Sequence, residues 1–406
     1  MNTYPLVAAP KIRHTTACKV NSVTVVVFSS QGGMTHYAEM LVEPLRARLR
    51  AELYIALTPS PPALNELLGR FVGERSRRVF TQAARLTIKY RAATYRQMAR
   101  DMVRRTNPQI VHITSLSVGL WPFVKELVSI GVRVVYTVHD PVPHEEVKTI
   151  WGALFLWGQR KFSLPRVFLN CSAIHVHSII HADQLVVRYG KNLKSRLYVA
   201  QHGAGLPAAI ARGAEVPPEI CRLSPEIPTL LFFGRIEKYK GLGVLLEAVK
   251  IVDSNQASFN LVIAGGGDLP AMPRDLTFVN LVLANRFIRD AEVRSFFENC
   301  DVVVLPYTGA TQSGVIPMAY AFSKPVIASR IGALKEVVND GITGLLVRPG
   351  DPSDLANAIL EFLAGRANTE KMGRAAQECG QGVLAWSAVA DVHIQRYDRL
   401  LEMNAT

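Results

Sequence analysis

The chain has 406 residues, of which 49% are hydrophobic and 19% charged, and its formal net charge is +13. That length and apolar content suffice for two α/β domains with separate cores and exclude a mostly disordered chain. No apolar stretch approaches the roughly 20 residues of a membrane-spanning helix, no signal peptide is expected, and five scattered cysteines without a C-x-x-C pair indicate free thiols in the cytosol.

The N-terminal half predicts strands that alternate with helices. The run from Val23 to Ser29 is almost continuously β-branched, as expected of a strand buried on both faces of a parallel sheet. A turn containing Gly32 and Gly33 follows, and then a helical segment from Thr35 to Leu49. Later strand candidates are Ile110–Ile113, Arg133–Thr137, Ala173–His177 and Leu197–Ala200. This recurrence predicts a doubly wound parallel sheet with its sites at the carboxyl ends of the strands.

A basic amphipathic stretch extends from Arg70 to Arg105. It contains eleven Lys or Arg against two acids, Glu74 and Asp101, with apolar residues between them. Such a stretch suits an anionic membrane surface, where each cation contributes about 1 kcal/mol. A solvated helix face and a nucleic-acid site are the alternatives. Because no DNA- or RNA-binding motif accompanies the charge, we favour the membrane surface and expect no nucleic acid as a partner.

Prolines interrupt the pattern before residue 229, where a second alternation of strands and helices begins. Its predicted strands are Thr229–Phe233, Asn260–Ala264, Val302–Leu305 and Val326–Ala328. We therefore predict two Rossmann-like domains, residues 1–205 and 229–384, joined by a linker at residues 206–228. A C-terminal helix at residues 385–406 is expected to return to the first domain. Two such domains facing each other imply a cleft that binds ligands.

The first candidate site follows the strand Thr229–Phe233. There Gly234 and Gly241 frame two cations, Arg235 and Lys240. A guanidinium can hold phosphate oxygens in a bidentate fork, and an ammonium group acts as a mobile point charge. A nucleoside diphosphate leaving group needs this compensation, because negative charge builds on it as the glycosidic bond breaks. A surface ion pair is the alternative, but the glycines favour phosphate.

A second candidate site lies at the start of a helix further along this domain. Consecutive backbone N–H groups at a helix N-terminus attract anions, hydroxyl side chains add donors, and a glycine lets a ligand approach the backbone. An ordinary capped helix start is the alternative. The residues are Thr311, Gln312, Ser313, Gly314 and Val315.

Together these segments resemble the retaining glycosyltransferases of family 4, which have the GT-B fold. The resemblance covers nearly the whole chain and includes G-R-x4-K-G at residues 234–241, the glycine-rich element at 261–267, C-D-V-V-V-L-P at 300–306 and the elements at 332–336 and 340–344. It implies that Phe287 and Ile288 bind the nucleoside, and that Gly32 and Gly33 face the diphosphate and the acceptor.

The sequence departs from the family pattern at two glutamates eight positions apart, which in the family hold the donor sugar and the ribose. Thr311 stands at the first position, and Met318 or Ala319 at the second. The Thr311–Gly314 version resembles a subgroup of bacterial polysaccharide enzymes. We therefore expect the diphosphate contacts to persist, whereas the sugar and ribose contacts of the family cannot be carried over.

His139 is the candidate for chemistry near the sugar. It ends the strand Val134–Val138 at the edge where an α/β sheet presents its ligands, and the segment Thr137–Pro143 resembles the family element whose histidine contacts the donor sugar. A structural histidine is the alternative. His202 matches a family position near the hinge, with a structural or weak binding role.

The sequence thus predicts a retaining hexosyltransferase that uses a nucleotide-sugar donor. No D-x-D motif is present, so we expect neither a metal nor another cofactor. Fixed cationic side chains are expected to neutralise the diphosphate instead. We expect the acceptor to be lipid-linked or a polysaccharide and to belong to exopolysaccharide biosynthesis. We expect the enzyme to lie in the cytoplasm, on the inner face of the membrane. A catalytically inactive binding subunit and a nucleotide-sugar epimerase are the alternatives.

Overall fold

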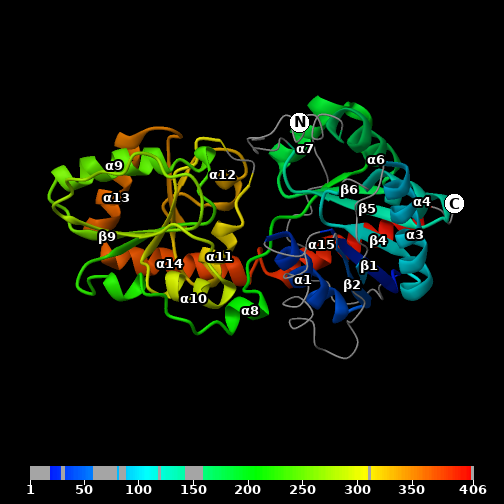
Figure 1. Cartoon of the computed structure of the whole chain (residues 1–406), viewed down its shortest axis with the longest axis horizontal. Helices are drawn as coiled ribbons and strands as arrows, with labels where there is room; N and C mark the ends of the chain where they lie inside the picture. The colour runs from blue at the N-terminus through cyan, green and yellow to red at the C-terminus, as the bar shows by residue number, and fades with distance from the viewer. Residues whose placement is uncertain are drawn as a thin grey trace. The chain divides into compact units, whose positions relative to one another are not determined.

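A computed structural model describes residues 19–28, 33–57, 80–81, 88–117, 120–141, 159–309 and 312–403. The chain forms two compact units, one from residues 1–201 together with 386–406 and the other from residues 202–385. Each unit is a parallel sheet covered by helices, which confirms the predicted pair of doubly wound α/β domains (Figure 1).

The sheet of the first unit has the strand order β3-β2-β1-β4-β5-β6-β7, with every neighbouring pair parallel. The order reverses at β1, whose neighbours are β2 on one side and β4 on the other. Such a reversal is the point at which open α/β sheets bind ligands. The strands are β1 (Ser22–Val27), β2 (Arg50–Leu57), β3 (Phe80–Thr81), β4 (Ile110–Ile113), β5 (Arg133–Val138), β6 (Ala173–Val176) and β7 (Leu197–Val199).

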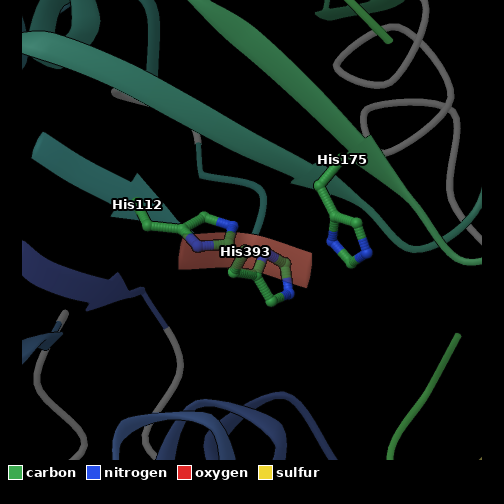
Figure 2. A group of neighbouring side chains, drawn as sticks. All are labelled: His112, His175 and His393. Atoms are coloured by element: carbon green, nitrogen blue, oxygen red, sulfur yellow. The ribbon is translucent and has the colours of Figure 1, made fainter. Parts of the chain in front are cut away.

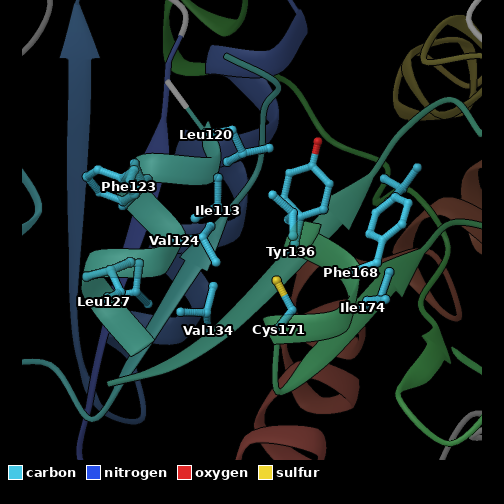
Figure 3. Packing of buried hydrophobic residues seen from close by; sticks show 14 of the residues in the cluster. Ile113, Leu120, Phe123, Val124, Leu127, Val134, Tyr136, Phe168, Cys171 and Ile174 are labelled. Carbon is cyan, nitrogen blue, oxygen red and sulfur yellow. The ribbon is translucent and has the colours of Figure 1, made fainter. Parts of the chain in front are cut away.

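Helices cover both faces of this sheet. On one face α1 and α15 pack against Val23, Val25 and Val27 of β1, and on the other face Val26 joins a second core. Figure 3 shows part of this second core, where Phe123 and Leu127 of α4 lie over the sheet. The continuous apolar run of β1 is therefore buried on both sides, as the sequence indicated. The helices are α1 (Gly33–Arg46), α3 (Ile88–Thr106), α4 (Leu120–Ser129), the π-helix η1 (Gln159–Ser163), α6 (Leu164–Asn170), α7 (Ile179–Tyr189), the 3-10 turn η2 (Lys191–Leu193) and α15 (Trp386–Glu402).

The second unit repeats this plan with the strand order β10-β9-β8-β11-β12-β13, again all parallel. Here the order reverses at β8, between β9 and β11. The strands are β8 (Thr229–Phe233), β9 (Phe259–Ala264), β10 (Val279–Ala284), β11 (Val302–Leu305), β12 (Val326–Ser329) and β13 (Gly344–Val347).

In the second unit α9 and α13 cover one face of the sheet, and α8, α10, α11 and α14 lie on the other (Figure 1). The helices are α8 (Ala208–Ala211), η3 (Ile220–Arg222), η4 (Lys238–Lys240), α9 (Leu242–Ser254), α10 (Asp290–Glu298), α11 (Val315–Ala321), α12 (Leu334–Val337), α13 (Pro352–Ala364) and α14 (Arg366–Gln381).

The segment 206–228, predicted as a linker, belongs to the second unit. The Glu215 N–H donates to the Ala291 carbonyl at 3.1 Å, and Glu219 forms an ion pair with Arg286 at 3.0 Å. Its prolines therefore mark irregular structure that packs on a domain, and the linker prediction is wrong. Among the strands of the described residues, four were not predicted from the sequence, namely β2, β3, β10 and β13. They lie at or next to sheet edges, where partial exposure weakens the apolar signal.

Candidate functional site

The loops after β8 and β11 meet at the reversal point of the second sheet. The Thr308 N–H donates to the Tyr239 carbonyl at 2.8 Å, and the rings of Tyr239 and Tyr307 lie edge to face with centroids 5.8 Å apart. A Cβ placed on Gly241 would lie 1.9 Å from the Pro306 carbonyl oxygen, and its φ is +72°. Only glycine therefore allows the loop that carries the two predicted cations to contact the end of β11 this closely.

Glycines also let the loops after β8 and β9 approach each other. The Gly234 N–H donates to Ala264 O at 2.9 Å, and the Ile236 N–H donates to Gly266 O at the same distance. A Cβ on Gly265 would lie 2.2 Å from the Gly234 carbonyl oxygen. The glycine-rich element after β9 thus holds the loop with Arg235 in place through backbone contacts.

Lys240 is buried within this loop, with 9% of its surface exposed. Its Nζ lies 3.0 Å from the place that a Cβ on Gly234 would take. Among the described residues no carboxylate forms an ion pair with it. The pKa of Lys240 is lowered to about 8, mainly by burial and to a smaller extent by the nearby Arg235 guanidinium, against the attraction of Glu237. An anion bound beside Nζ would stabilise the charged form of this desolvated ammonium group.

Arg235 has the opposite environment. Its side chain is 73% exposed, and its Nη2 lies 3.2 Å from Oε1 of Glu237. An exposed pair of this kind contributes little to stability, and the guanidinium remains accessible to a ligand. The structure therefore brings both predicted cations into one loop, one buried and one at the surface.

The start of α11 lies after β11 in the same unit. Ser313 Oγ accepts the Val315 N–H at 3.2 Å and contacts the Tyr307 hydroxyl at 3.2 Å. Gly314 is exposed. Gln312 Oε1 is buried without a hydrogen-bond partner among the described residues, a feature that the sequence did not reveal. Thr311 lies outside the described residues.

His202 lies close to this helix start, because a Cβ on Gly314 would be 3.9 Å from its Nε2. The other ring nitrogen, Nδ1, faces the Gly203 carbonyl at 2.9 Å and must donate, since a carbonyl only accepts. Burial lowers the pKa of His202. Its Nε2 therefore carries a lone pair beside Gly314. At the second family glutamate position the side chains are apolar, since Met318 and Ala319 pack in the core.

Phe287 and Ile288 follow β10. Phe287 is 72% exposed, whereas Ile288 is buried. The preceding Arg286 forms ion pairs with Glu219 at 3.0 Å and Glu292 at 2.9 Å, which fix the backbone of this segment. Of the two predicted nucleoside contacts, only Phe287 therefore offers a side-chain surface for stacking.

At the reversal point of the first sheet, the ends of β1 and β4 are joined through side chains. Ser115 Oγ accepts the Phe28 N–H at 2.6 Å, and the Thr114 N–H donates to Val26 O at 2.9 Å. Gly33 begins α1, and a Cβ there would meet nothing within 4 Å. Gly32 lies outside the described residues.

His139 follows β5 at the same edge and is 8% exposed. Its Nε2 lies 2.8 Å from the Thr114 carbonyl oxygen, and its Nδ1 lies 2.9 Å from Nε2 of His177. Tyr37 of α1 packs edge to face on both histidine rings, with centroids 4.9 Å and 5.4 Å away. The predicted sugar-binding histidine is therefore held by three elements of the first unit.

A second group of histidines lies at the face of this sheet that α15 covers, and the sequence analysis did not identify it. Figure 2 shows His393, which α15 carries, beside His112 and His175 of the strands. All three are buried, and one ligand nitrogen from each lies within 4.8 Å of the others, a spacing that invites comparison with a metal site. The sequence signal is weak, since single histidines on two strands and a helix form no motif.

Hydrogen bonds engage both ring nitrogens of His112 and His175, whereas Nε2 of His393 is buried without a hydrogen-bond partner among the described residues. Nε2 of His175 faces the Ala200 carbonyl at 2.9 Å and must carry the proton, so its Nδ1 accepts from the Thr137 hydroxyl at 3.0 Å. Thr137 Oγ1 then accepts from Nε2 of His112 at 2.7 Å, and Nδ1 of His112 accepts from the Tyr397 hydroxyl at 2.6 Å. Metal binding would break this chain, which instead fastens α15 to the sheet.

The basic stretch is described only in part, at residues 80–81 and from residue 88 onward. There Arg100 pairs with Glu126 at 2.5 Å, and Arg104 pairs with Asp101, so part of the excess charge is compensated on α3 and α4. Within the described ranges, no helix combines the length and the apolar character needed to cross a bilayer.

Comparisons with known proteins agree with this arrangement. Residues 31–204 match the family model described as Glycosyltransferase Family 4, and residues 227–365 match the one described as Glycosyl transferases group 1. The chain is 26% identical over 275 residues to D-inositol 3-phosphate glycosyltransferase of Paenarthrobacter aurescens, which is 66% of this chain and 67% of that protein.

Among solved structures, Anabaena Alr3699/HepE in complex with UDP superposes with a TM-score of 0.66 at 17% identity over 94% of this chain and all of that one. UDP-GlcNAc 2-epimerase from Neisseria meningitidis, bound to UDP-GlcNAc, reaches a TM-score of 0.53 at 11% identity over 94% of this chain and all of the epimerase. At these identities the likeness establishes the fold.

Proposed function

Because the chain belongs to the family 4 glycosyltransferases, which have the GT-B fold and use nucleotide-sugar donors, we propose that it moves a hexose with retention of configuration onto a lipid-linked or polysaccharide acceptor. The observation that carries the donor site is the buried Lys240 at the reversal point of the second sheet, which has no carboxylate partner in the part of the chain that the structure describes. A diphosphate would supply the missing negative charge.

In this proposal the diphosphate is bound by Lys240, Arg235 and the start of α11. Arg235 is exposed, so its guanidinium can turn from Glu237 towards the diphosphate. There two of its N–H groups can donate to two phosphate oxygens at once. The buried Oε1 of Gln312 and the hydroxyl of Ser313 add polar groups nearby. These fixed groups would stabilise the charge that develops on the leaving diphosphate, so no metal is required for that role.

The nucleoside would stack on the exposed ring of Phe287. His139 would contact the donor sugar, with Gly33 beside the diphosphate and acceptor. Retention would follow from attack of the acceptor hydroxyl on the face from which the diphosphate departs, with the leaving phosphate accepting the proton. The acceptor is proposed to belong to exopolysaccharide biosynthesis. The enzyme would then work in the cytoplasm on the inner face of the membrane, held by the basic residues between Arg70 and Arg105.

UDP is the first ligand to test, because similar folds have been solved with it. Thermal unfolding with and without UDP would measure binding by the wild type and by Arg235→Ala and Lys240→Met. A nucleotide at one hundred times its Kd stabilises the wild type by about 2.7 kcal/mol, and this gain should shrink in both variants. Lys238→Met is the matched control, since Lys238 is an exposed lysine of the same turn. Equal UDP stabilisation in all four proteins would refute the diphosphate site.

A catalytically inactive nucleotide-binding subunit is the second candidate. The apolar packing of Met318 and Ala319 favours it, because family members place a glutamate at this point of α11. Incubation of purified protein with UDP-hexoses separates the two candidates, since an active transferase hydrolyses its donor slowly without acceptor. UDP binding without release of hexose from any donor would favour the inactive subunit.

A further inference from the structure

We propose that His177 is a positioning residue that strengthens the Nε2–H of His139 as a hydrogen-bond donor to the sugar and, by engaging Nδ1, prevents His139 from acting as a general base. This inference rests on the proposed contact between His139 and the donor sugar. It adds a second histidine to the site, and it assigns the proton on each ring nitrogen of His139.

The protonation pattern follows from the partners. A backbone carbonyl only accepts hydrogen bonds, so the 2.8 Å contact between Nε2 of His139 and Thr114 O requires a proton on Nε2. In the neutral ring Nδ1 then carries the lone pair, and it accepts a hydrogen bond from Nε2 of His177 at 2.9 Å. The bonds therefore run in one direction, from His177 through His139 to Thr114.

This direction limits the chemistry of His139. Its lone pair is engaged by His177, so the imidazole cannot take a proton from an acceptor hydroxyl without losing that bond. Its Nε2–H can still be shared between the Thr114 carbonyl and a sugar hydroxyl oxygen, as a three-centre bond. Because Nδ1 accepts a hydrogen bond, the ring is polarised and its Nε2–H becomes a stronger donor.

The surroundings of the pair restrict its movement. His177 is 3% exposed and directly follows β6, the strand paired with β5, which ends before His139. Tyr37 from α1 packs edge to face on both rings, and Trp386 from α15 packs on Tyr37 with centroids 5.2 Å apart. Removing the His177 donor would leave the ring of His139 in place but free its lone pair.

The test compares His177→Leu, which removes the donor, with His177→Gln, whose side-chain amide offers an N–H at a similar distance. We expect His177→Leu to lower kcat for hexose release from a UDP-hexose roughly 10- to 100-fold with little change in KM, because the donor to the sugar is weakened while the nucleotide contacts remain. His177→Gln should recover most of this loss. His393→Leu removes another buried histidine of the same unit and should leave kcat unchanged.

A second measurement reports the hydrogen bond at Nδ1 directly. In 15N spectra of histidine-labelled protein, Nε2 of His139 should be protonated in all three proteins, because the Thr114 carbonyl holds that proton. The resonance of the unprotonated Nδ1 should shift in His177→Leu, which loses the donor, and stay near the wild-type position in His177→Gln. An unchanged kcat or an unchanged Nδ1 resonance in His177→Leu would overturn the inference while the transferase proposal stands. A wild type that neither binds UDP nor turns over a UDP-hexose would instead refute the proposed function.

Discussion

Replacing Lys240 by Met should stabilise the unliganded protein while it removes the diphosphate site. Methionine keeps the length of the side chain and removes a buried charge that no carboxylate of the described residues neutralises. The pKa of Lys240 is about 8 in the folded protein, against 10.5 for the unperturbed group. Each unit of this difference corresponds to about 1.4 kcal/mol, so the charged form costs roughly 3 kcal/mol at neutral pH.

The sign of the pH dependence follows from the same difference. Between pH 8 and pH 10.5 the unfolded state holds more protons than the folded state, so the free energy of unfolding of the wild type increases as the pH rises through this window. Below pH 8 the full cost of the buried charge is present. Lys240→Met should therefore exceed the wild type in stability at pH 7, with the difference disappearing near pH 10.5.

The assay is thermal unfolding at pH 7 and at pH 10, with and without UDP. We expect the Tm of unliganded Lys240→Met to rise by several degrees at pH 7, and the increase of Tm on adding UDP to fall. Lys238→Met, at an exposed position two residues earlier, should change neither quantity. A Lys240→Met protein that is less stable than the wild type, or that keeps the full response to UDP, would refute the reasoning.

Three further predictions concern pH and the buried histidines. First, the Kd for UDP should increase about tenfold per pH unit above pH 8, as Lys240 loses its proton, which calorimetric titration at pH 7, 8 and 9 measures; a constant Kd would contradict this. Second, Thr137→Val leaves Nε2 of His112 and Nδ1 of His175 without their hydroxyl and should lower the free energy of unfolding by roughly 2–5 kcal/mol in urea titration, whereas Thr137→Ser should stay near the wild type. Third, burial holds the pKa of His112 and of His393 well below 6.5, so the unfolded state binds their protons before the folded state does. The free energy of unfolding should therefore fall by up to about 1.4 kcal/mol per histidine for each pH unit below 6.5. Urea titration at several pH values should show a smaller slope in His393→Leu than in the wild type.

Local patterns were sufficient to predict both sheets and the loop with the two cations. The β-branched run of β1 and the apolar strands β8 and β11 are buried in the centres of their sheets, where the pattern is strongest. Gly234 and Gly241 take positive φ values, so their identity alone indicated the special backbone of the loop. Edge strands such as β10 and β13 were missed because they are only partly buried.

The sequence by itself thus determined the α/β class and the presence of Arg235, Lys240 and His139 at the ends of strands, because hydrophobic period and glycine position are local properties of the chain. Only the tertiary structure decided that Lys240 is buried and Arg235 exposed, and that both ring nitrogens of His139 have partners. Burial and hydrogen bonding depend on residues distant in the chain, as His112 and Tyr397 are, 285 positions apart. No local pattern records such contacts, because packing of the complete fold creates them.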